Sequence, residues 1–63
     1  MQRFYFKKID RNSGVPQMSY GFVRDGEVYI DEVKQEVFVA RMIIKKIEEM
    51  EKQEKEVYVI TIH

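Results

Sequence analysis

The 63-residue sequence contains no cysteine, and its one histidine is the last residue, His63. The absence of cysteine excludes disulfide bonds and fits a reducing compartment. Structural zinc sites take their ligands from cysteine and histidine, so we predict no metal and no cofactor. A domain this small that has neither device must be stabilised by its packing or by association.

Long apolar runs are absent too. No segment approaches the roughly 20 apolar residues of a membrane span, and no charged-then-apolar stretch at the start reads as a signal peptide. We therefore expect a soluble, cytoplasmic (intracellular) protein that does not use a membrane. A chain of this length buries only about 60% of the surface that its unfolded form exposes, so we expect one domain with a small core.

The sequence also lacks an excess of one charge, since eleven basic residues balance eleven acidic ones. This balance argues against a domain whose affinity depends on neutralising phosphates. The two signs are unevenly placed, with five basic residues against one acidic residue in 1–24 and six against ten in 25–63. The basic and the acidic part can face different partners, or they can face each other between two copies of the chain.

The patterns that are present predict an α+β domain with the element order β-β-β-α-β. Aromatic and β-branched residues with a period near two predict strands at 3–9, 18–24, 27–31 and 56–62. Turn-forming residues fill the connection between the first two strands. A right-handed crossover would place the last strand parallel to the first and beside it, in the spatial order 3-2-1-4 of a mostly antiparallel sheet.

A helix is predicted between the third and the last strand. Asp31 can accept hydrogen bonds from the free amides of a first turn, and Glu32 beside it suits the positive end of a helix. Two Glu–Lys pairs spaced i,i+4 support a helix in the second half. The segment 37–44 is apolar and β-branched enough for a strand, but its connection to the charged helical segment favours a helix to about residue 52.

The pair Asp25-Gly26 predicts a two-residue hairpin turn of type I′ between the second and third strands. This turn sets a register in which Phe22 faces Tyr29. One face of the hairpin is then aliphatic, with a gap at Gly21 where a helix can approach closely, so we place the helix there. The opposite face carries Tyr20, Phe22 and Tyr29.

Apolar residues cover nearly the whole predicted helix. The residues predicted to meet the sheet are Val33, Val37, Ala40, Ile44 and Ile47. Phe38 and Met42 project from nearly the opposite side, and one flank is extended by Val39, Ile43 and Met50. Apolar patches of this kind mark interaction sites. The predicted partner-binding residues on the helix and the sheet are Phe38, Met42, Val39, Tyr20, Phe22 and Tyr29.

The stretch YGFV (20–23) resembles the centre of the RNP1 motif of RNA-recognition-motif domains, whose aromatic residues stack on bases. Met18, Ser19 and Asp25 depart from that motif, and 10–17 is too short for the helix that the family requires, so we do not place the chain there. Aromatic residues on one sheet face can bind bases, and they can equally be cross-strand pairs that stabilise a hairpin.

The run FYFKK (4–8) also combines aromatic and basic residues, as single-strand binders do. Its plainer reading is an edge strand whose lysines prevent aggregation. The residues of the nucleic-acid alternative are Arg3, Tyr5, Lys7 and Arg24.

Catalytic chemistry has little basis in the sequence. Ser13 and Ser19 have no histidine nearby, and neither a P-loop nor a dinucleotide fingerprint occurs, so we expect no enzyme and no small-molecule substrate. We predict a non-catalytic binding protein that acts through the apolar surfaces of its sheet and helix. It would be a small accessory regulator or inhibitor, of a host or viral machine, that self-associates as a dimer or binds a larger protein. The alternative is a nucleic-acid-binding module that uses the aromatic and basic sheet face.

Overall fold

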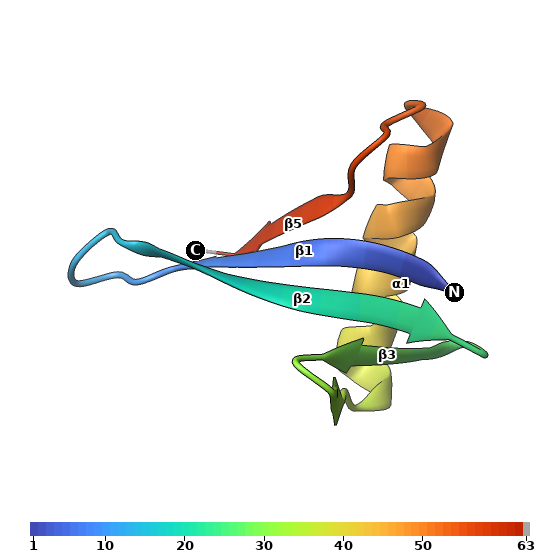
Figure 1. The fold of residues 1–63 in the computed structure, drawn as a ribbon, viewed down its shortest axis with the longest axis horizontal. Helices are drawn as coiled ribbons and strands as arrows, with labels where there is room; N and C mark the ends of the chain where they lie inside the picture. Colours follow the sequence, from blue (N-terminus) through green and yellow to red (C-terminus); the bar gives the residue numbers. More distant parts are fainter. Residues whose placement is uncertain (63) are drawn as a thin grey trace.

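The computed structural model describes residues 1–62, which form a mixed five-stranded sheet and one helix (Figure 1). In chain order the elements are β1 (Gln2–Ile9), β2 (Pro16–Arg24), β3 (Glu27–Ile30), β4 (Val33–Lys34), α1 (Val37–Lys52) and β5 (Val59–Ile62). The predicted α+β class is confirmed, and β4 is an addition to the predicted order. His63, the single histidine, lies outside the described residues. No helix among residues 1–62 is long and apolar enough to cross a membrane.

The strands lie in the order β4-β3-β2-β1-β5. The first four strands form an antiparallel meander, and β5 pairs with β1 in parallel. The predicted position of the last strand, parallel to the first and beside it, is therefore correct. Since β1 has a neighbour on each side, it is not an edge strand, and edge protection does not explain its lysines. The β1–β2 hairpin extends past the other strands, and α1 crosses one face of the sheet (Figure 1).

Two tight turns connect β2, β3 and β4. Asp25 and Gly26 have φ values of 53° and 77°, as a type I′ turn requires, and the predicted pairing of Phe22 with Tyr29 is confirmed. Asp31 and Glu32 have φ values of 49° and 68° and form a second turn of this kind. The prediction that Asp31 caps the helix is therefore wrong, because these residues reverse the chain into β4.

The helix begins at Val37, later than predicted, and the late start changes the set of residues in contact with the sheet. The buried core consists of Phe4, Val28, Ala40, Ile43, Ile47 and Ile60. The prediction was correct for Ala40 and Ile47, and Ile44 packs against the core from a half-buried position. Val33 and Val37 are exposed, because the former belongs to β4 and the latter begins the helix. Ile43, predicted on the flank, is at the centre with 1% exposure.

Gly21 makes room for an aromatic ring and not for the helix. It pairs with Phe4 across β1 and β2. A Cβ at Gly21 would lie 2.2 Å from Cζ of Phe4, so the Phe4 ring occupies the space that a side chain would need. The predicted gap exists, but a neighbouring strand fills it.

Candidate binding surfaces

The sheet has an open face, defined as the face opposite α1. Strand alternation and the observed registers place on it Arg3, Tyr5, Lys7, Met18, Tyr20, Phe22, Arg24, Glu27, Tyr29, Lys34, Val59 and Thr61. All sheet residues predicted for a protein partner, and all those predicted for nucleic acid, lie on this face. The sequence did not identify Met18, Lys34 and Val59 as members. It does not fix the registers of β1 with β2 and β5, and it predicts Lys34 within the helix and not in β4.

One row of the open face runs across four strands. Arg3 stands opposite Phe22, Phe22 opposite Tyr29, and Tyr29 opposite Lys34. The rings of Phe22 and Tyr29 are stacked, with centroids 4.9 Å apart and planes 15° apart. The guanidinium of Arg24 lies 6.0 Å from the Tyr29 centroid, at the outer limit of a cation–π contact. The row therefore holds an aromatic pair between two cations.

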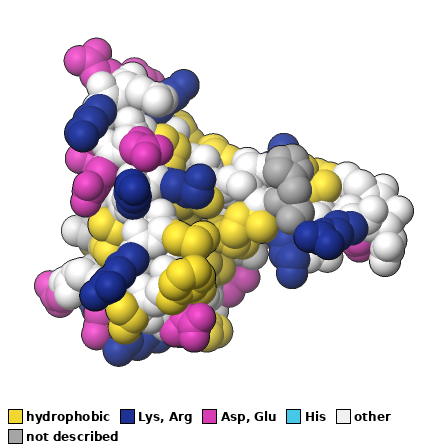
Figure 2. Space-filling model, turned by 180° about the vertical axis from the view of Figure 1, so that it is seen from behind, with side chains coloured by type: hydrophobic (Ala, Val, Ile, Leu, Met, Phe, Trp, Pro, Cys, Tyr) yellow, Lys and Arg dark blue, Asp and Glu magenta, His cyan; other side chains and the backbone are white. Residues whose placement is uncertain are grey.

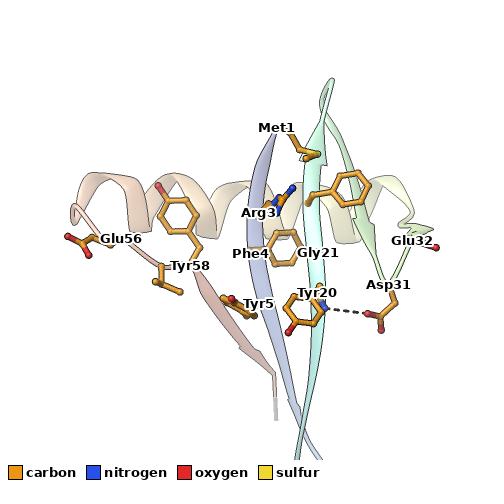
Figure 3. Close-up of a pocket in the computed structure, with 12 residues that line it drawn as sticks. Met1, Arg3, Phe4, Tyr5, Tyr20, Gly21, Asp31, Glu32, Glu56 and Tyr58 are labelled. Carbon is orange, nitrogen blue, oxygen red and sulfur yellow. Dashed lines mark hydrogen bonds between the residues drawn. The ribbon is translucent and has the colours of Figure 1, made fainter.

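A second row contains the most exposed ring of the open face. Tyr5 and Tyr20 face each other with centroids 5.4 Å apart and planes tilted by 55°. Tyr20 is 72% exposed and Tyr5 39%. Figure 3 shows the backbone N–H of Tyr20 donating to Oδ1 of Asp31, at 3.3 Å. Asp31, which does not cap the helix, thus ties its turn to β2.

A shallow groove of about 900 Å³ lies over these rows (Figure 3). Tyr5, Tyr20 and Phe22 line its middle, and Arg3 adds one cation. Its ends are acidic, with Asp31 and Glu32 at one end and Glu56 at the other. The groove is thus aromatic in the middle and acidic at its ends.

Glu27 and Lys34 form an ion pair beside the stacked rings. Nζ of Lys34 lies 3.0 Å from Oε1 of Glu27, and the hydroxyl of Tyr29 donates to Oε2 of Glu27 at 3.0 Å. The hydrogen bond from Lys34 is the main reason that the pKa of Glu27 is lowered, and the hydrogen bond from Tyr29 lowers it further. In return, Glu27 raises the pKa of Lys34. Both groups stay charged at neutral pH, so Lys34 is paired, while Arg3, Lys7 and Arg24 are the other cations of the open face.

The second surface is the helix patch, defined as Phe38 and Met42 on α1. Phe38 is 70% exposed and Met42, one turn later, 41%. Val39, the third helix residue predicted to bind a partner, is half-buried and packs against the core. Figure 2, which views the helix side, shows hydrophobic side chains gathered over the N-terminal half of α1 and charged side chains around its C-terminal half.

The described residues contain no group of three or more His, Cys, Asp or Glu side chains that could hold a metal ion. Two exposed surfaces on opposite sides of the sheet are the candidates for binding, the open face and the helix patch. Comparisons with protein-family models, with curated proteins and with solved structures found no match for this chain.

Proposed function

We infer that this chain is a non-catalytic binding protein that self-associates through the helix patch. The exposure of Phe38 and Met42, at 70% and 41%, carries this proposal. Six side chains make up the buried core of residues 1–62, so the apolar surface left outside is large for so small a core. Packing this patch against another surface would add the apolar burial that a domain of this size lacks.

The charges of α1 favour a second copy as the occupant. In chain order its charged residues are Arg41, Lys45, Lys46, Glu48, Glu49, Glu51 and Lys52. Arg41, Lys45 and Lys46 form a basic stretch, which an acidic stretch of Glu48, Glu49 and Glu51 follows. Two helices that pair antiparallel can place the basic stretch of each beside the acidic stretch of the other. In an isolated helix Glu49 and Glu51 lie unfavourably in the last turn, near the negative end, and Lys52 offsets only part of their charge. The antiparallel partner supplies the compensating positive charge.

The open face lies on the other side of the sheet and stays uncovered in such a dimer. It can hold the larger protein that an accessory regulator or inhibitor engages. Its exposed rings, Tyr20 above all, suit a protein partner, because aromatic side chains dominate the energetics of interfaces.

Light scattering after gel filtration tests self-association. At tens of micromolar we expect twice the chain mass of 7.6 kDa, and for Phe38→Glu we expect the chain mass itself. Val15→Glu is the matched control, because Val15 is exposed to 57% but lies in the β1–β2 turn, away from α1. A wild-type monomer at this concentration would refute the proposal, and so would a Phe38→Glu variant that is folded and still dimeric.

A second candidate function is the binding of single-stranded nucleic acid by the open face. It is favoured by the presence of Arg3, Lys7 and Arg24 on the same uncovered face as the stacked and exposed rings. Bases can stack on such rings while cations contact the phosphates. The interior position of β1 also removes the simplest structural reason for Lys7.

Fluorescence anisotropy with a labelled single-stranded oligonucleotide tests this second function. Affinity should fall steeply between 50 and 200 mM salt, roughly in proportion to the number of phosphates contacted. Phe22→Ala should weaken binding by about 1–3 kcal/mol if a base stacks there, while Phe38→Ala, on the opposite side, should leave it unchanged. Absence of binding at low salt would eliminate this candidate.

A further inference from the structure

The two edges of the sheet differ in their protection against pairing with another chain. β4, at one edge, has two residues, one of them Lys34, and follows a turn with two left-handed residues. β5, at the other edge, has the sequence VITI, without a charge, a proline or a glycine. Edge strands are usually kept very short, charged or distorted, because their unpaired backbone groups accept a further strand. β5 has none of these protections except its modest length.

The ladder with β1 shows which backbone groups of β5 are free. The N–H of Tyr5 donates to the carbonyl of Tyr58 at 2.8 Å, and Tyr5 stands opposite Val59. Since the direction of hydrogen bonding alternates along a strand, alternate residues from Tyr58 onward bond to β1. The N–H and C=O groups of Val59 and Thr61 therefore point out of the sheet. Residues 1–62 provide no backbone partner for them.

A groove accompanies this edge on the helix side. Its walls are Lys46, Glu49 and Met50 of α1, Gln53 after the helix, and the β5 residues Val59, Ile60 and Thr61. A strand added beside β5 would turn alternate side chains toward the two faces of the sheet. Every second side chain would thus approach the groove and the end of the helix.

The charge around the β5 edge distinguishes between possible occupants. Residues 48–56 hold five glutamates and two lysines, and the carbonyl end of α1 adds negative partial charge. This end of α1 lies on the β5 side of the sheet (Figure 1). Two copies paired edge to edge through β5 would bring two acidic helix ends together, which like charges oppose.

We propose that the β5 edge binds an extended segment of a partner protein by strand addition. The segment has Lys or Arg at the alternate positions that face the end of α1. Its backbone bonds to Val59 and Thr61, and its cations on the helix side lie near Glu49. This site is separate from the helix patch, so it does not depend on self-association through α1.

Amide hydrogen exchange of the full chain, followed by NMR, tests the proposal. The probe is a nine-residue peptide that alternates valine with lysine, acetylated and amidated at its ends. Without it, the amides of Val59 and Thr61 should exchange quickly and that of Ile60 slowly. At saturation the peptide should slow the exchange of Val59 and Thr61 at least about tenfold. A peptide with glutamate in place of lysine should bind roughly tenfold more weakly or worse.

A pair of variants locates the contact. Thr61→Pro removes an N–H that does not bond to β1 and places a ring on the free edge, so binding should weaken roughly tenfold. Thr61→Val keeps that N–H and should bind as the wild type does. Slow exchange of Ile60 shows that the variant is folded. If Thr61→Pro does not fold, the contact is tested from the other side with a peptide that is N-methylated at its pairing amides. This peptide should not bind to the wild-type protein.

Three results would overturn the proposal. The first is saturation binding that leaves the exchange of Val59 and Thr61 unchanged, and the second is the absence of binding. The third is protection of Val59 and Thr61 that grows with protein concentration and without peptide, because it assigns the edge to a second copy. Dimerisation that leaves these two amides unprotected is compatible with the proposal, since it uses another surface.

Discussion

Replacing Gly21 with alanine tests the packing between β1 and β2. The added Cβ would lie 2.2, 2.6 and 2.7 Å from Cζ, Cε2 and Cε1 of Phe4, whereas ordinary contacts begin at 3.4 Å. The ring must therefore move by more than 1 Å within a core where it is 2% exposed. Overpacking of this kind costs about 1–3 kcal/mol. For a domain of this size each kcal/mol lowers Tm by roughly 4–8 °C.

The second half of the test removes the obstacle. Leucine at position 4 lacks the three ring atoms that approach Gly21, so Phe4→Leu should make room for the methyl group. In that background Gly21→Ala should be neutral or stabilising, because alanine is favoured over glycine within a strand by about 0.5–1 kcal/mol. The sign of the Gly21→Ala effect should therefore reverse between the two backgrounds, which is a coupling between neighbours.

Urea denaturation monitored by circular dichroism gives the free energy of unfolding of the wild type, the two single variants and the double variant. Equal slopes of this free energy against urea concentration show that the unfolding transitions are comparable. Gly14→Ala is the control, because Gly14 has a φ of 72° and no atom within 4 Å of an added Cβ. Its cost of about 1–2 kcal/mol is conformational and should be the same with Phe4 or leucine. A Gly21→Ala cost that is equal in both backgrounds would refute the steric explanation.

Two further predictions concern the core and the hairpin. Ile43→Ala should lower the free energy of unfolding by about 2–5 kcal/mol, because Ile43 is 1% exposed. Ile44 is half-buried, so Ile44→Ala should lower it clearly less. Equal losses in urea denaturation would contradict the observed orientation of the helix. The pKa of Asp10 lies below its usual value, chiefly because the backbone N–H of Asn12 donates to the Asp10 carboxylate at 2.8 Å. The charged carboxylate therefore stabilises the folded state above about pH 4, and this stabilisation is lost as the pH falls through the lower folded-state pKa. An NMR titration of the Asp10 carboxyl with a midpoint at or above the usual value would contradict this.

The parts of the fold that the sequence predicts are those set by short-range rules. Asp25-Gly26 fixes a two-residue turn, and the turn fixes the pairing of Phe22 with Tyr29. The sequence does not predict the helix start, because Asp31-Glu32 has the composition of a helix N-terminus. The pairing of β3 with β4 and the hydrogen bonds between Asp31 and Tyr20 hold it in a left-handed turn. Because the helix start is wrong, the predicted core is wrong too: it includes Val33 and Val37, which are exposed, and omits Ile43, which is buried.

The same rule explains which residues of the open face the sequence brings together. Tyr20, Phe22 and Tyr29 share a hairpin whose register is local, so their common face follows from the sequence. The position of Tyr5 opposite Tyr20 depends on the β1–β2 register, and the connection at 10–15 is too long for its residue types to fix that register. The predicted strand order places the last strand at an edge, as observed, but the backbone groups that β5 leaves free depend on its register with β1 and do not follow from the sequence.

The pairing of β1 with β5 implies an order of events during folding. The meander β1–β4 and the helix form from contacts between neighbours in sequence, whereas β5 must pair with a strand from the far end of the chain. Contacts between distant residues form late, because closing the intervening loop is entropically unfavourable. Until β5 arrives, β1 is itself an edge, and Lys7 and Lys8 lie on it. The lysines that protect no edge in the finished protein thus protect one in the growing or refolding chain, and pulse-labelled hydrogen exchange during refolding should show the amides of β5 protected last.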